Sequence, residues 1–205
     1  MISLCMVVHN NAPVLSRAID SAKDLVNEIV IVDQDSTDKT GEIAQSYADI
    51  YIKKRMKGNA DPDREYCAAM ARGEWLLWLD GDEYLSEALQ KRIPKVAVDE
   101  FFDIYWIKFQ NFIDGINIQS IMGDDWHPRL YKKGSLVWSP QAHTYPETKS
   151  PLQAWVEQPI VHDREWKQVK EVHKIRSKCI SLEAQEAEAK FLTQVEEILK
   201  HGKKK

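Results

Sequence analysis

Two aspartates that follow an apolar stretch have the spacing to hold a divalent cation. In the segment "WLLWLDGDE", Asp80 and Asp82 come after Leu79 and are separated by Gly81, which lets the backbone turn sharply. Two carboxylates this close repel one another unless a positive charge lies between them. Mn²⁺ or Mg²⁺ suits such oxygen ligands and also binds phosphate oxygens. The spacing therefore predicts a metal site suited to phosphate chemistry.

A second acidic segment, "VDQDSTD" at residues 32–38, follows the apolar run "EIVIV". Aspartate, serine and threonine are frequent where a strand gives way to a helix, because their side chains cap helices and stabilise turns. This pattern predicts that Ser36, Thr37 and Asp38 cap a helix. Asp33, at the end of the apolar run, is a candidate ligand-binding residue, and a simple turn is the alternative interpretation.

The apolar pattern of the first hundred residues predicts alternating strands and helices. Strands are predicted at 2–8, 28–33, 49–54 and 74–80, and helices at 12–25, at 36–47 and from Asp61 to just before Gly73. Such alternation indicates an α/β fold with a mostly parallel central sheet flanked by helices. Ligands bind such sheets beyond the carboxyl ends of the strands. Asp33 and Asp80 fall at those ends.

The second half of the chain has a different pattern. Residues 101–119 are rich in aromatic and β-branched residues, and Asp114 followed by Gly115 predicts a hairpin turn. Further short strands are expected within residues 127–138. Residues 164–200 are rich in helix formers and have an apolar stripe, which predicts one long helix or two consecutive helices.

Composition and charge argue against several classes of function. The 205 residues carry a net charge of −4, which disfavours broad nucleic-acid binding. The three cysteines form no closely spaced pair, so neither a disulfide framework nor a zinc site is indicated. No apolar run approaches the ~20 residues that a membrane helix needs, and the first residues lack the features of a signal peptide. A cytoplasmic protein is expected.

Three stretches taken together resemble a known family. The run "ISLCMVVHNNAPVLSRAIDSAKDLVNEIVIVDQDSTDKTGEIA", then Arg64, then "ARGEWLLWLDGDE" are similar in order and spacing to the donor-binding half of the family 2 glycosyltransferases with the GT-A fold. The resemblance implies one domain over 1–205, with a nucleotide-sugar-binding half at 1–100, an acceptor-side half with a smaller β-hairpin region at 101–163, and C-terminal helices at 164–205. The compact chain also resembles virus-encoded members, for which the host cytoplasm is the expected location.

The activity that the resemblance implies is a metal-dependent, inverting transfer of a hexosyl or deoxyhexosyl group. The donor would be a nucleoside-diphosphate sugar, with a UDP-sugar expected first, and the acceptor a hydroxyl of a glycan or glycoprotein. Gln34 and Asp35 depart from the residues that many relatives carry there, so only Asp33 takes over a role from this segment. The implied roles are Val8 and Asp33 for the base pocket, Arg64 for the nucleotide or its phosphates, Asp80 for the ribose or the Mn²⁺ or Mg²⁺ ion, and Asp82 and His162 for that ion.

The catalytic base is left open between three residues. Relatives carry a His-Glu pair after a "PRLF" strand, whereas this chain has His143 followed by Thr144. Glu147 and Asp125 are the alternatives to His143. A catalytically degenerate sugar- or nucleotide-binding subunit is therefore a rival function. A sugar-nucleotide nucleotidyltransferase is another, but "VVHNNAPVL" lacks the glycines that a phosphate-binding loop would need.

Overall fold

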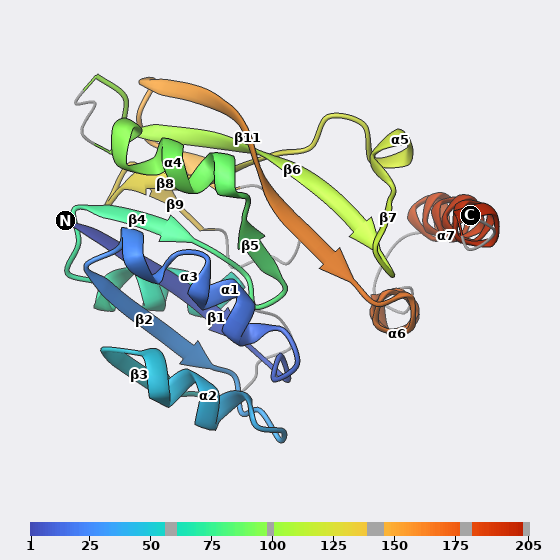
Figure 1. The fold of residues 1–205 in the computed structure, drawn as a ribbon, viewed down its shortest axis with the longest axis horizontal. Coiled ribbons are helices and arrows are strands. Elements are labelled where there is room, and N and C mark those ends of the chain that lie inside the picture. The colour runs from blue at the N-terminus through green and yellow to red at the C-terminus, as the bar shows by residue number, and fades with distance from the viewer. Residues whose placement is uncertain (56–60, 98–100, 139–145, 177–181, 203–205) are drawn as a thin grey trace. The chain divides into compact units, whose positions relative to one another are not determined.

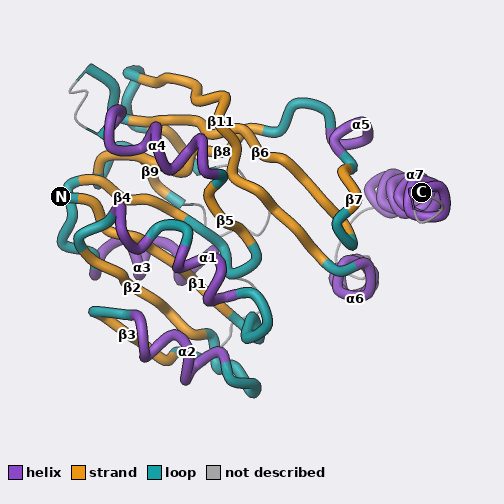
Figure 2. The backbone as a smooth tube through the Cα atoms, viewed as in Figure 1, coloured by secondary structure: helices purple, strands orange, loops and turns teal. Residues whose placement is uncertain are grey.

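The computed structural model describes residues 1–55, 61–97, 101–138, 146–176 and 182–202. The chain forms two compact units. The first unit contains Met1–Lys108 and Trp126–Ile160, and the second contains Phe109–Asp125 and Val161–Lys205. Two strands, β6 (Ile104–Ile113) and β11 (Gln153–Arg164), belong to both units and are drawn as continuous strands in Figure 2. The division of a single domain at residues 100 and 163 stays a prediction.

Four parallel strands form the centre of the first unit. They are β1 (Ile2–Val8), β2 (Glu28–Asp33), β3 (Ile50–Lys53) and β4 (Trp75–Trp78), arranged in the order β3-β2-β1-β4. Every residue of β1, β2 and β4 is buried. Helices on both faces bury the strands of a parallel sheet, which is why these strands read as continuous apolar runs.

The sheet continues beyond β4 with strands from the second half of the chain. The order continues as β4-β8-β6-β11-β5, where β8 is Trp126–Lys132 and β5 is Glu83–Leu85. β8 is antiparallel to both β4 and β6. Two short strands, β9 (Leu136–Val137) and β10 (Glu147–Thr148), form a separate antiparallel pair. The predicted mostly parallel central sheet is confirmed in β1 to β4, and the antiparallel strand β8 makes the sheet mixed.

Helices cover the parallel strands on both faces. In Figure 1, α1 (Leu15–Asp20) and α2 (Thr40–Tyr47) lie in front of the sheet and α3 (Asp61–Met70) lies behind it. The helix predicted at 12–25 is instead α1 followed by a short 3-10 helix, Lys23–Leu25. The first unit also contains α4 (Glu87–Val96), whose N-cap Ser86 accepts a hydrogen bond from the backbone N–H of Leu89.

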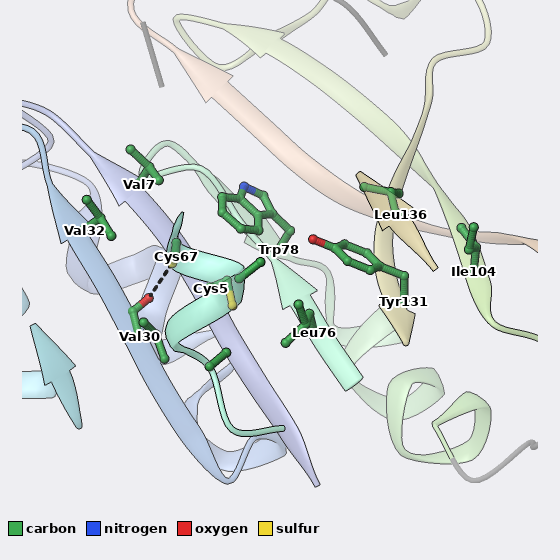
Figure 3. Packing of buried hydrophobic residues seen from close by; sticks show 12 residues of the cluster. Cys5, Val7, Val30, Val32, Cys67, Leu76, Trp78, Ile104, Tyr131 and Leu136 are labelled. Carbon is green, nitrogen blue, oxygen red and sulfur yellow. Dashed lines mark hydrogen bonds between the residues drawn. The ribbon is translucent and has the colours of Figure 1, made fainter. Parts of the chain in front are cut away.

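The core between the sheet and α3 is shown in Figure 3. Trp78 and Tyr131 are its largest buried side chains. The thiol of Cys67 lies 3.6 Å from the backbone oxygen of Val30. Cys5 and Cys67 are free and buried, as packed reduced residues would be. Cys179 lies outside the described residues.

The second unit has its own apolar core. The end of β6 pairs with β7 (Ile116–Asn117) through a turn in which Asp114 and Gly115 both have positive φ, 50° and 73°, so the predicted hairpin is confirmed. The unit also contains α5 (Gln119–Met122), α6 (Trp166–Arg176) and α7 (Leu182–Gly202). The prediction of consecutive C-terminal helices is confirmed. The buried residues of this core are Ile113, Ile118, Val169, Val195 and Leu199.

Within the described part of the chain, none of the helices is both long and apolar enough to cross a membrane.

Candidate active site

The register of the parallel strands places the predicted residues at one edge of the sheet. Val8 is paired with Asp33, and Asp33 with Lys53. On the other side of β1, Trp78 is paired with Cys5, so Asp80 follows just beyond the end of β4. Because neighbouring strands lie about 4.8 Å apart, strands β2 and β4 are separated by about 10 Å. Asp33 and Asp80 therefore flank the end of β1.

Asp33 is a buried carboxylate with three internal hydrogen bonds. Its Oδ1 accepts from the backbone N–H of Ser36 at 2.9 Å and from the Ser36 hydroxyl at 2.5 Å, and its Oδ2 accepts from the hydroxyl of Tyr51 at 2.8 Å. Burial, together with the bond to Asp33, raises the pKa of Tyr51 to about 12, so this hydroxyl stays protonated and donates. Asp33 thus joins the ends of β2 and β3.

The segment after β2 is not the helix cap that the sequence predicts. Helix α2 begins at Thr40, and of the three predicted capping residues only Asp38 accepts from its first turn, through the backbone N–H of Thr40 at 2.9 Å. Ser36 donates to Asp33, while the backbone N–H of Thr37 donates to Asn10. The predicted cap does not form because the Ser36 and Thr37 groups join the loops after β1 and β2 instead of binding the helix end.

The loops that follow β1 and β2 hold each other through side chains. Asn10 donates its backbone N–H to the Ser36 hydroxyl at 3.0 Å, and the backbone N–H of Asn11 donates to Thr40 Oγ1 at 2.7 Å. His9 Nδ1 lies 2.7 Å from the backbone oxygen of Gln34, which can only accept, so the neutral imidazole carries its proton on Nδ1. The edge beside Val8 and Asp33 is therefore a network of polar groups with fixed directions.

Gln34, which departs from the family pattern, joins this edge to α3. Its amide donates to Asp63 at 2.7 Å, and the other carboxylate oxygen of Asp63 pairs with Lys54 at 2.5 Å. The Lys54 ammonium also lies over the ring of Tyr66. Gln34 and Asp63 are buried. Gln34, although it departs from the family pattern, is thus held by a hydrogen bond to Asp63.

Asp80 is held between two arginines. Arg64 of α3 reaches one carboxylate oxygen at 2.6 Å, and Arg129 of β8 reaches the other at 3.2 Å. Arg129 also pairs with Glu83 at 2.6 Å, and Glu83 accepts from the backbone N–H of Asp80 at 3.0 Å. Burial alone would raise the pKa of Asp80, but the two guanidinium groups hold it well below its usual range. Asp80 is therefore ionised throughout the neutral range.

Two tryptophans surround the Arg64 guanidinium. Its central carbon lies 5.0 Å from the ring centre of Trp78 and 4.7 Å from that of Trp138. Such contacts attract the cation to the ring faces. Arg64, which the resemblance assigned to the nucleotide or its phosphates, is here a buried partner of Asp80 with access limited by these rings.

Arg129 and Glu83 belong to this edge but were not predicted from the sequence. Both side chains are almost fully buried, 6% and 2% exposed. The signal was present: an arginine within the apolar "PRLYK" strand needs a buried carboxylate, and "DGDEY", which follows the neighbouring strand β4, supplies one.

Asp82 lies on the turn between β4 and β5 and is partly exposed. The preceding Gly81 packs against the loop after β1, because a Cβ there would lie 2.5 Å from the side chain of Asn11. No group of three or more metal-binding side chains is gathered in the described ranges. The carboxylates of Asp80 and Asp82 fit a divalent cation only if a ligand supplies further oxygens. Mg²⁺ is commonly bound by one or two carboxylates together with substrate phosphates. The fit therefore depends on a phosphate-bearing ligand.

The remaining predicted site residues are divided between the two units. His162 and Asp125 belong to the second unit, where Asn111 lies between them, 3.2 Å from His162 Nδ1 and 3.0 Å from Asp125 Oδ2. Glu147 belongs to β10 and is exposed, with an ion pair to Lys149 at 2.5 Å. His143 lies outside the described residues. Their roles stay predictions.

A comparison with known protein families shows which family the chain belongs to. A family model described as "Glycosyl transferase family 2" matches residues 3–154. The chain belongs to this family. The match includes the acidic segments at Asp33 and Asp80 and the strand that carries Arg129. The resemblance stated from the sequence is therefore confirmed.

Several curated relatives are similar to the chain. An uncharacterized glycosyltransferase of Rickettsia bellii is 25% identical, covering 99% of this chain and 69% of that protein. One from Rickettsia felis is 30% identical, covering 63% of this chain and 44% of that protein. The SPbeta prophage-derived glycosyltransferase SunS of Bacillus subtilis is 33% identical over 48% of this chain, which corresponds to 24% of SunS. The chain thus spans less than half of most of these relatives.

Among solved structures, TarS 1–349 of S. aureus in complex with UDP-GlcNAc is similar, with a TM-score of 0.59 and 18% identity. The likeness covers 79% of this chain and 58% of that one. The same fragment without a named ligand has a TM-score of 0.59 over 89% of this chain. At this level of identity the likeness shows a shared fold. The predicted GT-A-type α/β fold is confirmed.

Proposed function

We propose that this chain transfers a sugar from a nucleoside-diphosphate sugar, a UDP-sugar first, to a hydroxyl of a glycan or glycoprotein. The observation that carries the proposal is the pair of acidic strand ends, Asp33 at the end of β2 and Asp80 just after β4, at the carboxyl edge of the parallel strands in a family 2 glycosyltransferase. The likeness to TarS, whose complex contains UDP-GlcNAc, supports a uridine nucleotide.

Asp33 would recognise the base. Its Oδ2 accepts one hydrogen bond, from Tyr51, and a carboxylate oxygen has a second lone pair for an N–H of the base. The Tyr51 hydroxyl and the Ser36 groups would hold the carboxylate in place, since three donors already fix its plane. Val8, paired with Asp33 at the end of β1, would form the wall beside the base.

Asp80 and Asp82 would act on the ribose and the diphosphate. Arg64 and Arg129 keep Asp80 ionised and fix its direction, so it would accept from a ribose hydroxyl. Asp82 would hold a Mn²⁺ or Mg²⁺ ion together with phosphate oxygens of the donor. Such an ion, when bound, neutralises charge on the departing diphosphate.

The transfer itself would be a single displacement with inversion. The acceptor oxygen forms a bond to the anomeric carbon while the bond from that carbon to the diphosphate oxygen breaks, and the nucleoside diphosphate leaves with the electron pair. A general base takes the acceptor proton during this step. Asp125, Glu147 and His143 are the three candidates for the base.

A ligand panel tests the proposal. Uridine, guanosine, cytidine and thymidine diphosphates are added with and without Mn²⁺, and the melting temperature is measured. A ligand at 100 times its dissociation constant stabilises by about 2.7 kcal/mol. We expect UDP with Mn²⁺ to raise the melting temperature, and Asp33→Ala to remove this rise.

The control is Asp24→Ala, on the exposed 3-10 helix of the same unit, which should respond to UDP as the wild type does. If no nucleoside diphosphate shifts the melting temperature of the wild type, the proposal is contradicted. Nucleotide binding without transfer or hydrolysis of any UDP-sugar would favour the degenerate binding subunit.

A further inference from the structure

The hydrogen bonds that the Asp33 carboxylate already makes limit what it can accept from a ligand. Asp33 is only 1% exposed and ends β2 at the carboxyl edge of the parallel strands. An ionised carboxylate offers about four acceptor sites, two on each oxygen. The sites that the protein itself fills therefore decide which ligand group Asp33 can still bind.

Both acceptor sites of Asp33 Oδ1 are filled by Ser36. The backbone N–H of Ser36 donates to Oδ1 at 2.9 Å, and the Ser36 hydroxyl donates at 2.5 Å. The hydroxyl oxygen also accepts from the backbone N–H of Asn10 at 3.0 Å, so its single proton is directed to Asp33. Oδ1 is therefore occupied on both sides.

One of the two acceptor sites of Asp33 Oδ2 is filled from β3. The Tyr51 hydroxyl donates to Oδ2 at 2.8 Å. Tyr51 lies two residues before Lys53, the register partner of Asp33, so both side chains lie on the same face of the sheet. Helix α2 allows this close approach, because a Cβ at Gly41 would lie 3.0 Å from both Oδ2 and the Tyr51 hydroxyl oxygen. Asp33 thus keeps one acceptor site, on Oδ2.

A single acceptor site fits the imide edge of uracil or thymine. This edge has one N–H between two carbonyl groups, and a second carboxylate oxygen facing it would repel a carbonyl. Guanine instead presents two adjacent donors, N1–H and the 2-amino group, which suit both oxygens of a carboxylate. Cytosine has a lone pair on N3, which a carboxylate repels. The donors from Ser36 and Tyr51 therefore favour an imide base over guanine and cytosine.

We infer that Ser36 and Tyr51 are specificity-determining residues, which fill acceptor sites of Asp33 and so restrict the donor to a nucleotide of uracil or thymine. Resting on the proposed function, this assignment identifies what excludes guanine and cytosine from the donor. Ser36 and Tyr51 act through the carboxylate of Asp33, so they are positioning residues for the base.

Modified nucleotides test the single N–H. Calorimetry with the full chain and Mn²⁺ compares UDP with GDP, CDP and 3-methyluridine diphosphate, in which a methyl group replaces the N–H. We expect the last three to bind at least ~10-fold more weakly than UDP, because a hydrogen bond to a charged group is not made. 5-Methyluridine diphosphate keeps the N–H, and its affinity distinguishes a uracil site from one that also takes thymine. Binding of 3-methyluridine diphosphate as tightly as UDP would overturn the inference.

Two variants remove the internal donors one at a time. Ser36→Ala keeps the backbone N–H but frees one site on Oδ1, and Tyr51→Phe frees one site on Oδ2. Each variant should lower the preference for UDP over GDP by about 10-fold, since guanine gains a second acceptor. Lost packing would instead weaken the binding of both nucleotides alike. An unchanged base preference in both variants would overturn the inference.

Tyr47→Phe is the matched control. The Tyr47 hydroxyl also donates to an aspartate, Asp20 at 3.1 Å, but this bond is exposed and joins α2 to α1. Tyr47→Phe should therefore keep the wild-type base preference. If GDP binds the wild type as tightly as UDP, the inference fails and the nucleotide site stands. If none of the nucleoside diphosphates binds, the proposed function fails together with the inference.

Discussion

Glu28 and Asp80 are carboxylates paired with arginine at opposite ends of the parallel strands, and they are held in different ways. Glu28, the first residue of β2, accepts from the Ser3 hydroxyl at 2.5 Å and from the backbone N–H of Arg72 at 2.8 Å. The Arg72 guanidinium also pairs with it, although 68% of that side chain is exposed. Asp80 receives its strongest partners, Arg64 and Arg129, from side chains alone.

The difference in partners has a consequence for ligand binding. A backbone donor cannot leave Glu28 without a change in the fold, and Gly73 closes this site further, since a Cβ there would lie 2.5 Å from the Ser3 hydroxyl oxygen. Arg64 and Arg129 hold Asp80 through their side chains, so a change of partner at Asp80 needs no change of the backbone. The carboxylate at the amino ends of the strands is therefore fixed by the backbone, and the carboxylate at the carboxyl ends by side chains.

Substitution of Asp82, at the carboxyl ends of the strands, should have the largest effect on activity. Asp82→Ala should lower metal-dependent transfer at least ~1,000-fold, about 4 kcal/mol, because a metal stabilises the charge on the leaving diphosphate by several kcal/mol. The melting temperature should change little, since Asp82 is partly exposed on a turn. Steady-state assays with Mn²⁺ measure the loss, with Asp24→Ala as the control. Wild-type turnover in Asp82→Ala would place the metal elsewhere.

Removal of Arg129 should have the next largest effect. Arg129→Met keeps the length of the side chain but removes the charge that Asp80 and Glu83 share, and breaking a buried pair costs about 3 kcal/mol or more of unfolding free energy. Chemical denaturation measures this loss. Arg129→Met combined with Glu83→Gln should recover part of it. No recovery in the double variant would show that the two residues are not energetically coupled.

Glu28→Gln should lower stability without lowering function. We expect a loss of about 2 kcal/mol in unfolding free energy, because the charge-assisted hydrogen bonds from the Ser3 hydroxyl and the backbone N–H of Arg72 are replaced by neutral ones. The affinity for UDP, measured by calorimetry at a temperature where the variant is folded, should equal that of the wild type. A weaker UDP affinity would show that the amino ends of the strands are linked to the ligand edge.

The smallest expected effect is on the pH dependence of stability. Burial would raise the pKa of Glu28, but the hydrogen bonds from Ser3 and Arg72 outweigh it and lower this pKa. The unfolded chain therefore binds more protons at acid pH, so the stabilisation is present above the unfolded pKa, about 4.3, and is lost as the pH falls through the folded value. Between about pH 5 and 3, the melting temperature of Glu28→Gln should fall less steeply with decreasing pH than that of the wild type. Equal slopes would contradict the lowered pKa.

The parallel strands were predictable because burial on both faces leaves a continuous apolar run. β1 and β2 have the predicted bounds. The positions of Asp33, the last residue of β2, and Asp80, just after β4, follow from the strand pattern, because ligands bind such sheets at the carboxyl ends of the strands. Short helical connections leave few possible registers between the parallel strands. The sequence therefore also predicts that Asp33 and Asp80 lie near each other.

The partners of these acids were harder to predict. Arg129 reaches Asp80 because β8 lies antiparallel beside β4, a pairing over about fifty residues that no local pattern specifies. The Ser36 hydroxyl donates to Asp33, and the Thr37 hydroxyl donates to Asn10 of the neighbouring loop. Helix-cap propensities do not predict whether such a hydroxyl binds a helix end or another loop. Asn111 did leave a signal, a polar residue within an alternating apolar strand, but its partners are far apart in the sequence.

A crystal structure of the chain with UDP and Mn²⁺ would show where the nucleotide binds. We expect the uracil ring beside Asp33, the ribose at Asp80, and the ion in contact with both the diphosphate and the Asp82 carboxylate. Electron density for the nucleotide at any other surface, with the carboxyl ends of β1, β2 and β4 unchanged from the free chain, would contradict it.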